Sequence, residues 1–130
     1  GIIGFCRGGR TVWIYAANNS NVKAGVAFYG PLVDAPGQKS NWPKSATELA
    51  PDMKAPVLGL YGEADQGIPV AQVEAMKAAL QSAGKKAEFK TYPGAPHGFH
   101  ADYRPSYRKD AAEDAWNQLI AWFKANKVLS

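Results

Sequence analysis

The chain of 130 residues is long enough for one domain with a hydrophobic core. Its formal net charge of +4 comes from 15 Lys and Arg scattered among 11 acidic residues, without the basic run or aromatic-interleaved basic face of a nucleic-acid-binding protein. A single cysteine excludes an internal disulfide and disfavours a zinc site, and the sequence shows neither an apolar run that could span a membrane nor a signal peptide, so we expect a cytoplasmic protein that does not contact membranes.

The first segment joins a short strand to a helix through a glycine-rich turn. Residues 2–5 predict the strand, residues 7–17 predict the helix, and the turn reads Gly4-Phe5-Cys6-Arg7-Gly8-Gly9. This order is typical of a nucleophile elbow, here with Cys6 in place of the usual serine. Cys6 would lie at a helix N-terminus, which favours a thiolate, and the backbone N–H of Arg7 would be an oxyanion donor. The alternative for so short a motif is a buried structural cysteine.

The next segment predicts a second strand and then a long loop. Apolar residues alternate over residues 22–29, which indicates a strand that Gly30-Pro31 ends. From residue 32 to residue 55 there is no clean periodicity, and several prolines interrupt the sequence. We expect a long loop with a short helical turn, and loops of this length in compact domains are usually functional or poorly ordered.

The second half of the chain alternates strands and helices. Residues 56–61 and 87–92 predict strands, and the first of these is almost wholly apolar, as in a parallel sheet covered on both faces. Residues 70–83 predict a helix, and a last helix runs from residue 105 or 106 to about residue 126. The expected core face of the last helix consists of Ala112, Trp116, Leu119, Ile120 and Phe123.

This order of elements indicates an α/β protein with a parallel sheet. Ligands of such sheets bind beyond the carboxyl ends of the strands. Cys6, Asp65 and His97 each follow a different predicted strand, so they would meet at one edge. There, Cys6 would be the nucleophile, His97 would transfer its proton, and an acid would orient the imidazole. Asp65 could instead cap the following helix, with Glu63 as a competing acid.

The motifs together resemble the dienelactone hydrolase family, a branch of the α/β-hydrolase fold with cysteine in place of serine. The resemblance covers essentially the whole chain and favours Asp65 over Glu63 as the acid. It implies a hydrolase of small esters or lactones that forms a thioester and uses no metal and no organic cofactor. The matching segments are Gly4-Phe5-Cys6-Arg7-Gly8-Gly9, Tyr29-Gly30, Gly62-Glu63-Ala64-Asp65 with Ile68-Pro69, and Pro93-Gly94-Ala95-Pro96-His97-Gly98-Phe99.

The resemblance extends only to the C-terminal half of the family's domain. We therefore expect residues 1–130 to be a single partial α/β-hydrolase domain, with about four mainly parallel strands flanked by helices. The family's N-terminal half would supply a second oxyanion donor, a glutamate at the nucleophile and an arginine for the substrate carboxylate. A second family arginine lies four residues after the histidine, where this chain has Ala101. Arg104 is an offset candidate for substrate binding, and Tyr29 is another.

Two hypotheses about activity follow. In the first, the chain pairs with a separate N-terminal half, or with itself, and hydrolyses a small ester or lactone. In the second, the half-domain is catalytically inactive and acts only through assembly or interaction. His100 competes with His97 for the role of base, although a surface or supporting position suits it better.

Overall fold

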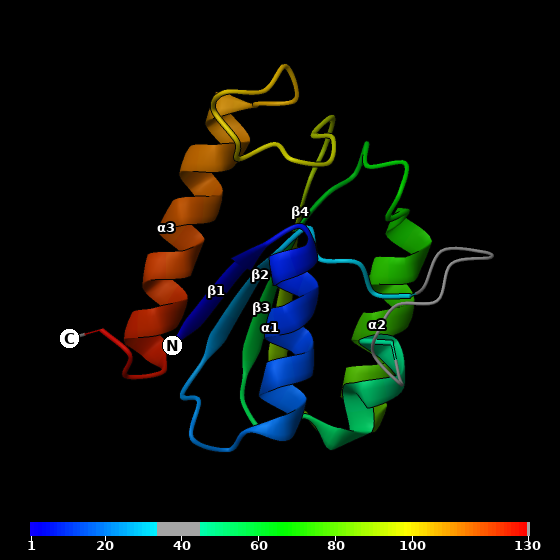
Figure 1. The fold of residues 1–130 in the computed structure, drawn as a ribbon, viewed down its shortest axis with the longest axis vertical. Helices are drawn as coiled ribbons and strands as arrows, with labels where there is room; N and C mark the ends of the chain where they lie inside the picture. The colour runs from blue at the N-terminus through cyan, green and yellow to red at the C-terminus, as the bar shows by residue number, and fades with distance from the viewer. Residues whose placement is uncertain (34–44, 130) are drawn as a thin grey trace.

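A four-stranded parallel sheet with the strand order β1-β2-β3-β4 forms the centre of the computed structural model, which describes residues 1–33 and 45–129. Helices α1 and α2 lie on one face of this sheet and α3 lies on the other (Figure 1). The strands are β1 (Ile2–Phe5), β2 (Gly25–Phe28), β3 (Val57–Gly62) and β4 (Ala87–Tyr92), and the helices are α1 (Arg7–Asn18), α2 (Val70–Ser82), α3 (Lys109–Ala125) and the short 3-10 helix η1 (Thr47–Asp52). The predicted fold class is confirmed.

The parallel register brings the carboxyl ends of all four strands to the same edge of the sheet. Phe5 of β1 pairs with Phe28 of β2, and Phe28 pairs with Leu60 of β3. At the far side, Gly62 of β3 pairs with Tyr92 of β4. The loops that follow the four strands therefore begin next to one another, as ligand sites of such sheets require.

Close contact between backbones fixes the first turn of α1 on this edge. A Cβ atom added to Gly4 would lie 2.0 Å from the backbone oxygen of Gly8. A Cβ atom added to Gly9 would lie 2.7 Å from the oxygen of Phe28 and 2.9 Å from Cα of Gly30. Only glycines allow the helix to approach the ends of β1 and β2 this closely, so their spacing sets the position of the turn between them.

A buried polar chain ties α1 to β3 and to the segment after β2. Trp13 and Tyr61 are fully buried, and the indole Nε1–H of Trp13 donates to the Tyr61 hydroxyl at 3.0 Å. The Tyr61 hydroxyl in turn donates to the carbonyl of Gly30 at 2.8 Å. Each of these polar groups therefore has a partner, so the fold does not lose the free energy that a buried, unpaired donor would cost.

The predicted core face of α3 is partly wrong. Trp116 is 44% exposed, whereas Trp122 is 5% exposed and joins the core. The helix also begins at Lys109 rather than at residue 105 or 106. The side chains buried on α3 are Ala112, Ala115, Leu119, Trp122 and Phe123. The amphipathic pattern allowed two neighbouring faces, and docking onto the sheet chose the one with Trp122.

The segment around β2 also differs from the prediction. The strand is limited to Gly25–Phe28. A turn lies at residues 20 and 21, and residues 22–24 form no regular structure although their apolar side chains alternate. The expected helical turn in the long loop is present as η1. The rest of that loop, residues 34–44, lies outside the described residues. None of the helices in the described ranges is both long enough and apolar enough to cross a lipid bilayer.

The glycine contacts make a direct prediction for stability. Gly4→Ala forces a methyl group into the backbone of Gly8, so we expect the free energy of unfolding to fall by about 2 kcal/mol or more. Gly8→Ala is the matched control, because no heavy atom lies within 4 Å of its added Cβ and alanine suits a helix better than glycine. Urea denaturation of both variants checks this, and equal loss in the two would contradict it.

Candidate active site

Cys6 occupies the turn between β1 and α1 in a backbone conformation that is rare for a residue with a side chain. Its φ is 57° and its ψ is −119°. The backbone around it is fixed on both sides, because its N–H donates to Phe28 at 3.0 Å and its carbonyl accepts from Gly9 at 2.9 Å. Such strain persists only where the surroundings impose it, and it occurs most often at functional sites.

His97 connects Cys6 to Asp65 through two short contacts. Its Nε2 atom lies 3.1 Å from Cys6 Sγ, and its Nδ1 atom lies 2.7 Å from Asp65 Oδ2. The three side chains come from the segments after β1, β3 and β4. The predicted meeting of these residues at one edge of the sheet is confirmed.

Asp65 is held so that one carboxylate oxygen faces the imidazole. The residue is 3% exposed, and its Oδ1 atom accepts the backbone N–H groups of Gly67 at 2.9 Å and Ile68 at 3.1 Å. Glu63, the competing acid, is exposed and accepts instead from the Thr91 hydroxyl at 2.7 Å. The structure therefore brings Asp65 to the histidine and keeps Glu63 away from it.

The hydrogen bond with Asp65 raises the pKa of His97 to about 9, because the carboxylate favours the protonated imidazole. Partial burial opposes this rise, and the contact with Cys6 adds to it. Near neutral pH the imidazole therefore carries a proton on both nitrogens. A cationic imidazole beside a sulfur atom is the arrangement in which cysteine acts as a thiolate nucleophile.

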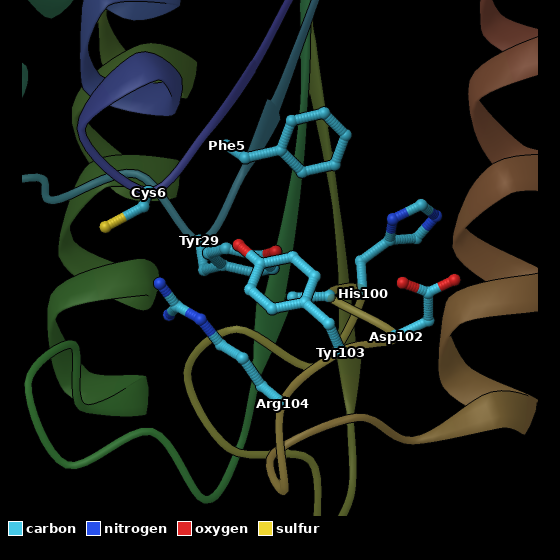
Figure 2. A pocket seen from close by; sticks show the side chains of 8 residues that line it. Phe5, Cys6, Tyr29, His100, Asp102, Tyr103 and Arg104 are labelled. Carbon is cyan, nitrogen blue, oxygen red and sulfur yellow. The ribbon is translucent and has the colours of Figure 1, made fainter.

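A pocket of about 520 Å³ opens beside Cys6 (Figure 2). Its volume lies within the usual range for small-molecule sites. Arg104 extends across it toward Cys6 in Figure 2, and its guanidinium carbon lies 5.6 Å from the ring centre of Tyr103. The lining residues are Phe5, Cys6, Tyr29, His100, Ala101, Asp102, Tyr103 and Arg104.

The remaining residues expected at the site lie around this pocket. Arg7 is the first residue of α1, directly after Cys6. Tyr29 lies on the pocket wall and is 3% exposed, and burial raises its pKa to about 12, so that its hydroxyl is neutral. Arg104 also lies on the wall, although it is seven residues beyond His97 rather than four.

Sequence reasoning missed two aromatic residues of the pocket wall, Phe5 and Tyr103, whereas it gave His100 a surface or supporting position. The His100 ring lies 4.9 Å from Phe28 and 5.3 Å from Phe5, and burial lowers its pKa. It supports the wall and does not contact Cys6 in the way His97 does. Phe5 could have been found from its place next to Cys6 in the elbow, whereas nothing in the sequence distinguished Tyr103.

Residues 1–33 and 45–129 contain no group of three His, Cys, Asp or Glu side chains arranged as a metal site would need.

The fold and the Cys6–His97–Asp65 arrangement are those of an α/β hydrolase. The dienelactone hydrolase family model matches residues 1–127, and the chain belongs to this family. A solved structure from Klebsiella pneumoniae, titled as a "Putative Dienelactone Hydrolase", superposes with a TM-score of 0.89 at 48% identity, over 95% of this chain and 51% of the other. The resemblance seen in the sequence is thereby confirmed.

Curated relatives agree with this family. A Methylorubrum extorquens protein named "Putative carboxymethylenebutenolidase" is 57% identical over 95% of this chain and 42% of its own length. An Escherichia coli K12 protein of the same name is 52% identical over 95% of this chain and 45% of its own length. The chain thus spans rather less than half the length of these relatives.

The contact between His97 and Asp65 predicts a titration. In Asp65→Asn, the amide would donate to Nδ1 and turn it into an acceptor, so the pKa of His97 should fall from about 9 toward its ordinary value. The raised pKa stabilises the fold below about pH 6.5, and this stabilisation is lost as the pH rises to about 9. The thermal midpoint of the wild type should therefore exceed that of Asp65→Asn below about pH 6.5, and this difference should shrink as the pH rises to about 9.

Imidazole proton shifts measured by NMR against pH check the titration. Glu63→Gln is the matched control, because it removes the same charge from the same loop but contacts Thr91 rather than the histidine. If Glu63→Gln lowers the pKa of His97 as much as Asp65→Asn does, general charge rather than the hydrogen bond sets that pKa.

Proposed function

We propose that this chain carries the catalytic triad of a carboxylic ester or lactone hydrolase. The observation that supports this best is the unbroken line of contacts from Cys6 Sγ through His97 to Asp65 Oδ2, at 3.1 Å and 2.7 Å. The names of relatives agree, among them a Bradyrhizobium protein called "Probable 2-oxo-3-(5-oxofuran-2-ylidene)propanoate lactonase", which is 33% identical. The substrate class is therefore a small ester or lactone.

In this scheme, the thiolate of Cys6 attacks the carbonyl carbon and forms a tetrahedral intermediate. The protonated His97 then gives its Nε2 proton to the departing alkoxide, and a thioester with Cys6 remains. His97 next removes a proton from water, which attacks the thioester and releases the carboxylic acid. Asp65 keeps the Nδ1 proton of the imidazole in place throughout.

The developing oxyanion needs donors, and the backbone N–H of Arg7 is the first candidate. Arg7 is the first residue of α1, and N–H groups in the first turn of a helix have no acceptor within the helix. Its position directly after the nucleophile is that of an oxyanion-hole donor in α/β hydrolases. We propose that the family's N-terminal half supplies the second donor and that full turnover requires it.

A burst experiment tests the function. With p-nitrophenyl acetate in excess, acylation of Cys6 should release about one equivalent of p-nitrophenolate per chain, even if hydrolysis of the thioester is slow. Cys6→Ala should abolish the burst, because the nucleophile is gone. Asp65→Asn should slow the burst by about 100-fold or more, since the matching change in a serine protease lowers kcat by about 10⁴.

Two results would contradict the proposal. A burst that persists in Cys6→Ala would remove Cys6 from the role of nucleophile. A folded wild-type chain that gives no burst would favour the alternative of an inactive half-domain that acts through assembly.

We further propose that Arg104 binds the anionic part of the substrate. Its guanidinium group extends across the pocket toward Cys6 (Figure 2), and arginine pairs well with a carboxylate. Tyr29 contributes to the wall of the same pocket. The substrate would therefore be an ester or lactone that carries a negative charge.

Alkylating reagents test Arg104 without requiring turnover. The measured quantity is the rate constant of Cys6 alkylation by iodoacetate divided by that by neutral iodoacetamide. This ratio should be larger in the wild-type chain than in Arg104→Gln. We expect the ratio of the two rate constants to fall about tenfold in the variant, which corresponds to ~1.4 kcal/mol. Arg108→Gln is the control, because its side chain donates to the backbone carbonyls of Pro105 and Tyr107. An equal fall in both variants would contradict a specific role.

A further inference from the structure

Tyr29 stands out on the pocket wall because its backbone is strained and its side chain is buried against the histidine. Its φ is 38°, which is unusual for a residue other than glycine, and the residue is 3% exposed. We propose that Tyr29 is a positioning residue for His97, whose imidazole it holds in the plane that aims Nε2 at the sulfur of Cys6. This inference rests on the proposed function, and it assigns Tyr29 a role beyond lining the pocket.

The backbone of Tyr29 is fixed from both sides of the sheet edge. Its N–H donates to the carbonyl of Leu60 in β3 at 2.7 Å. The next residue, Gly30, lies so close to α1 that an added Cβ would be 2.4 Å from the carbonyl carbon of Gly9. The first turn of α1 fixes the backbone conformation of Cys6, and by its contact with Gly30 it also fixes the direction of the Tyr29 side chain. Strain that surrounding structure imposes in this way is an indication of function.

The ring of Tyr29 lies between two side chains of the loop after β4. Its centre is 4.9 Å from the His97 ring at an interplanar angle of 62°, and 5.3 Å from the Phe99 ring at 69°. Both are edge-to-face contacts, which aromatic pairs prefer. Within residues 1–33 and 45–129, Tyr29 supplies the aromatic ring that contacts the imidazole.

The two contacts of the imidazole nitrogens do not by themselves fix the ring plane. Asp65 and Cys6 each make a single contact with the ring, at Nδ1 and Nε2, so small rotations about the Cα–Cβ and Cβ–Cγ bonds of His97 can still tilt the imidazole. The His97 side chain is 34% exposed, and solvent does not restrain this motion. A third contact out of the ring plane restrains it, and the edge-to-face packing of Tyr29 is such a contact.

The hydroxyl group of Tyr29 also faces the loop after β4. Burial raises the pKa of Tyr29 to about 12 and keeps the phenol neutral, while the nearby backbone of His100 opposes this rise. Tyr29 therefore contacts the loop at His97, His100 and Phe99. The titratable or charged groups around this arrangement are Asp65 and Cys6 at His97, and Cys6, Tyr103 and Arg104 at Tyr29.

Tyr29→Met tests the inference, because methionine fills much of the buried volume without an aromatic ring. We expect the burst rate constant with p-nitrophenyl acetate to fall about tenfold or more, while the saturation constant for the ester stays within about twofold. The pKa of His97 measured by NMR should fall from about 9 toward its ordinary value, because the imidazole no longer keeps its geometry with Asp65 and Cys6. Tyr29→Phe keeps the ring, so its burst rate constant and its His97 pKa should lie close to those of the wild type.

Either of two other outcomes would overturn the inference. If Tyr29→Met lowers the thermal midpoint but leaves the burst constant and the His97 titration unchanged, Tyr29 is only structural. If the saturation constant alone rises, Tyr29 acts on the substrate. Tyr15→Met, at an exposed tyrosine of α1, is the matched control and should change neither quantity. A wild-type chain without a burst would refute the proposed function, and the His97 titration would still decide the role of Tyr29.

A measurement on the wild-type chain does not depend on any variant folding. Nuclear Overhauser effects between the ring hydrogens of Tyr29 and His97 should be observable, because their centres lie 4.9 Å apart. Their absence in the folded protein would overturn the inference.

Discussion

The site depends on one steric constraint, the contact of the first turn of α1 with the ends of β1 and β2. Gly4, Gly9 and Gly30 lie within backbone contact of other segments, so no side chain fits at these positions. This contact forces Cys6 into a conformation with φ of 57° and leaves its sulfur facing the loop after β4. The elbow is therefore a consequence of packing between backbones, and the strain at Cys6 is offset by the many contacts of the helix and the sheet.

Polar groups at the carboxyl edge of the sheet are arranged so that charge can be moved without large motion. Asp65 is buried but receives two backbone N–H groups, which compensate for its removal from water. Its second oxygen stabilises a proton on His97, which in turn lies beside the sulfur. Cys6, His97 and Asp65 thus belong to one network of contacts, while aromatic side chains and Arg104 form the pocket beside it.

The fold could be predicted from the sequence nearly completely where periodicity and breakers agree. The strands Ile2–Phe5 and Ala87–Tyr92 have the predicted bounds, and α1 begins at Arg7 as expected. The errors fall where local pattern is ambiguous. Alternation before β2 does not form a strand. Trp116, expected in the core, is exposed and Trp122 is buried, because docking of α3 onto the sheet decides which side of an amphipathic helix is buried.

By itself, the sequence determined the elbow, the order of Cys6, Asp65 and His97, and their common edge, because glycine spacing and the ends of parallel strands are local features. Only the tertiary structure decided which carboxylate meets the imidazole, since Asp65 and Glu63 are two residues apart and differ in the direction of their side chains. It also decided that Tyr29, Tyr103 and Arg104 share a pocket with Cys6. These contacts join segments far apart along the chain, and their geometry depends on packing that no local pattern records.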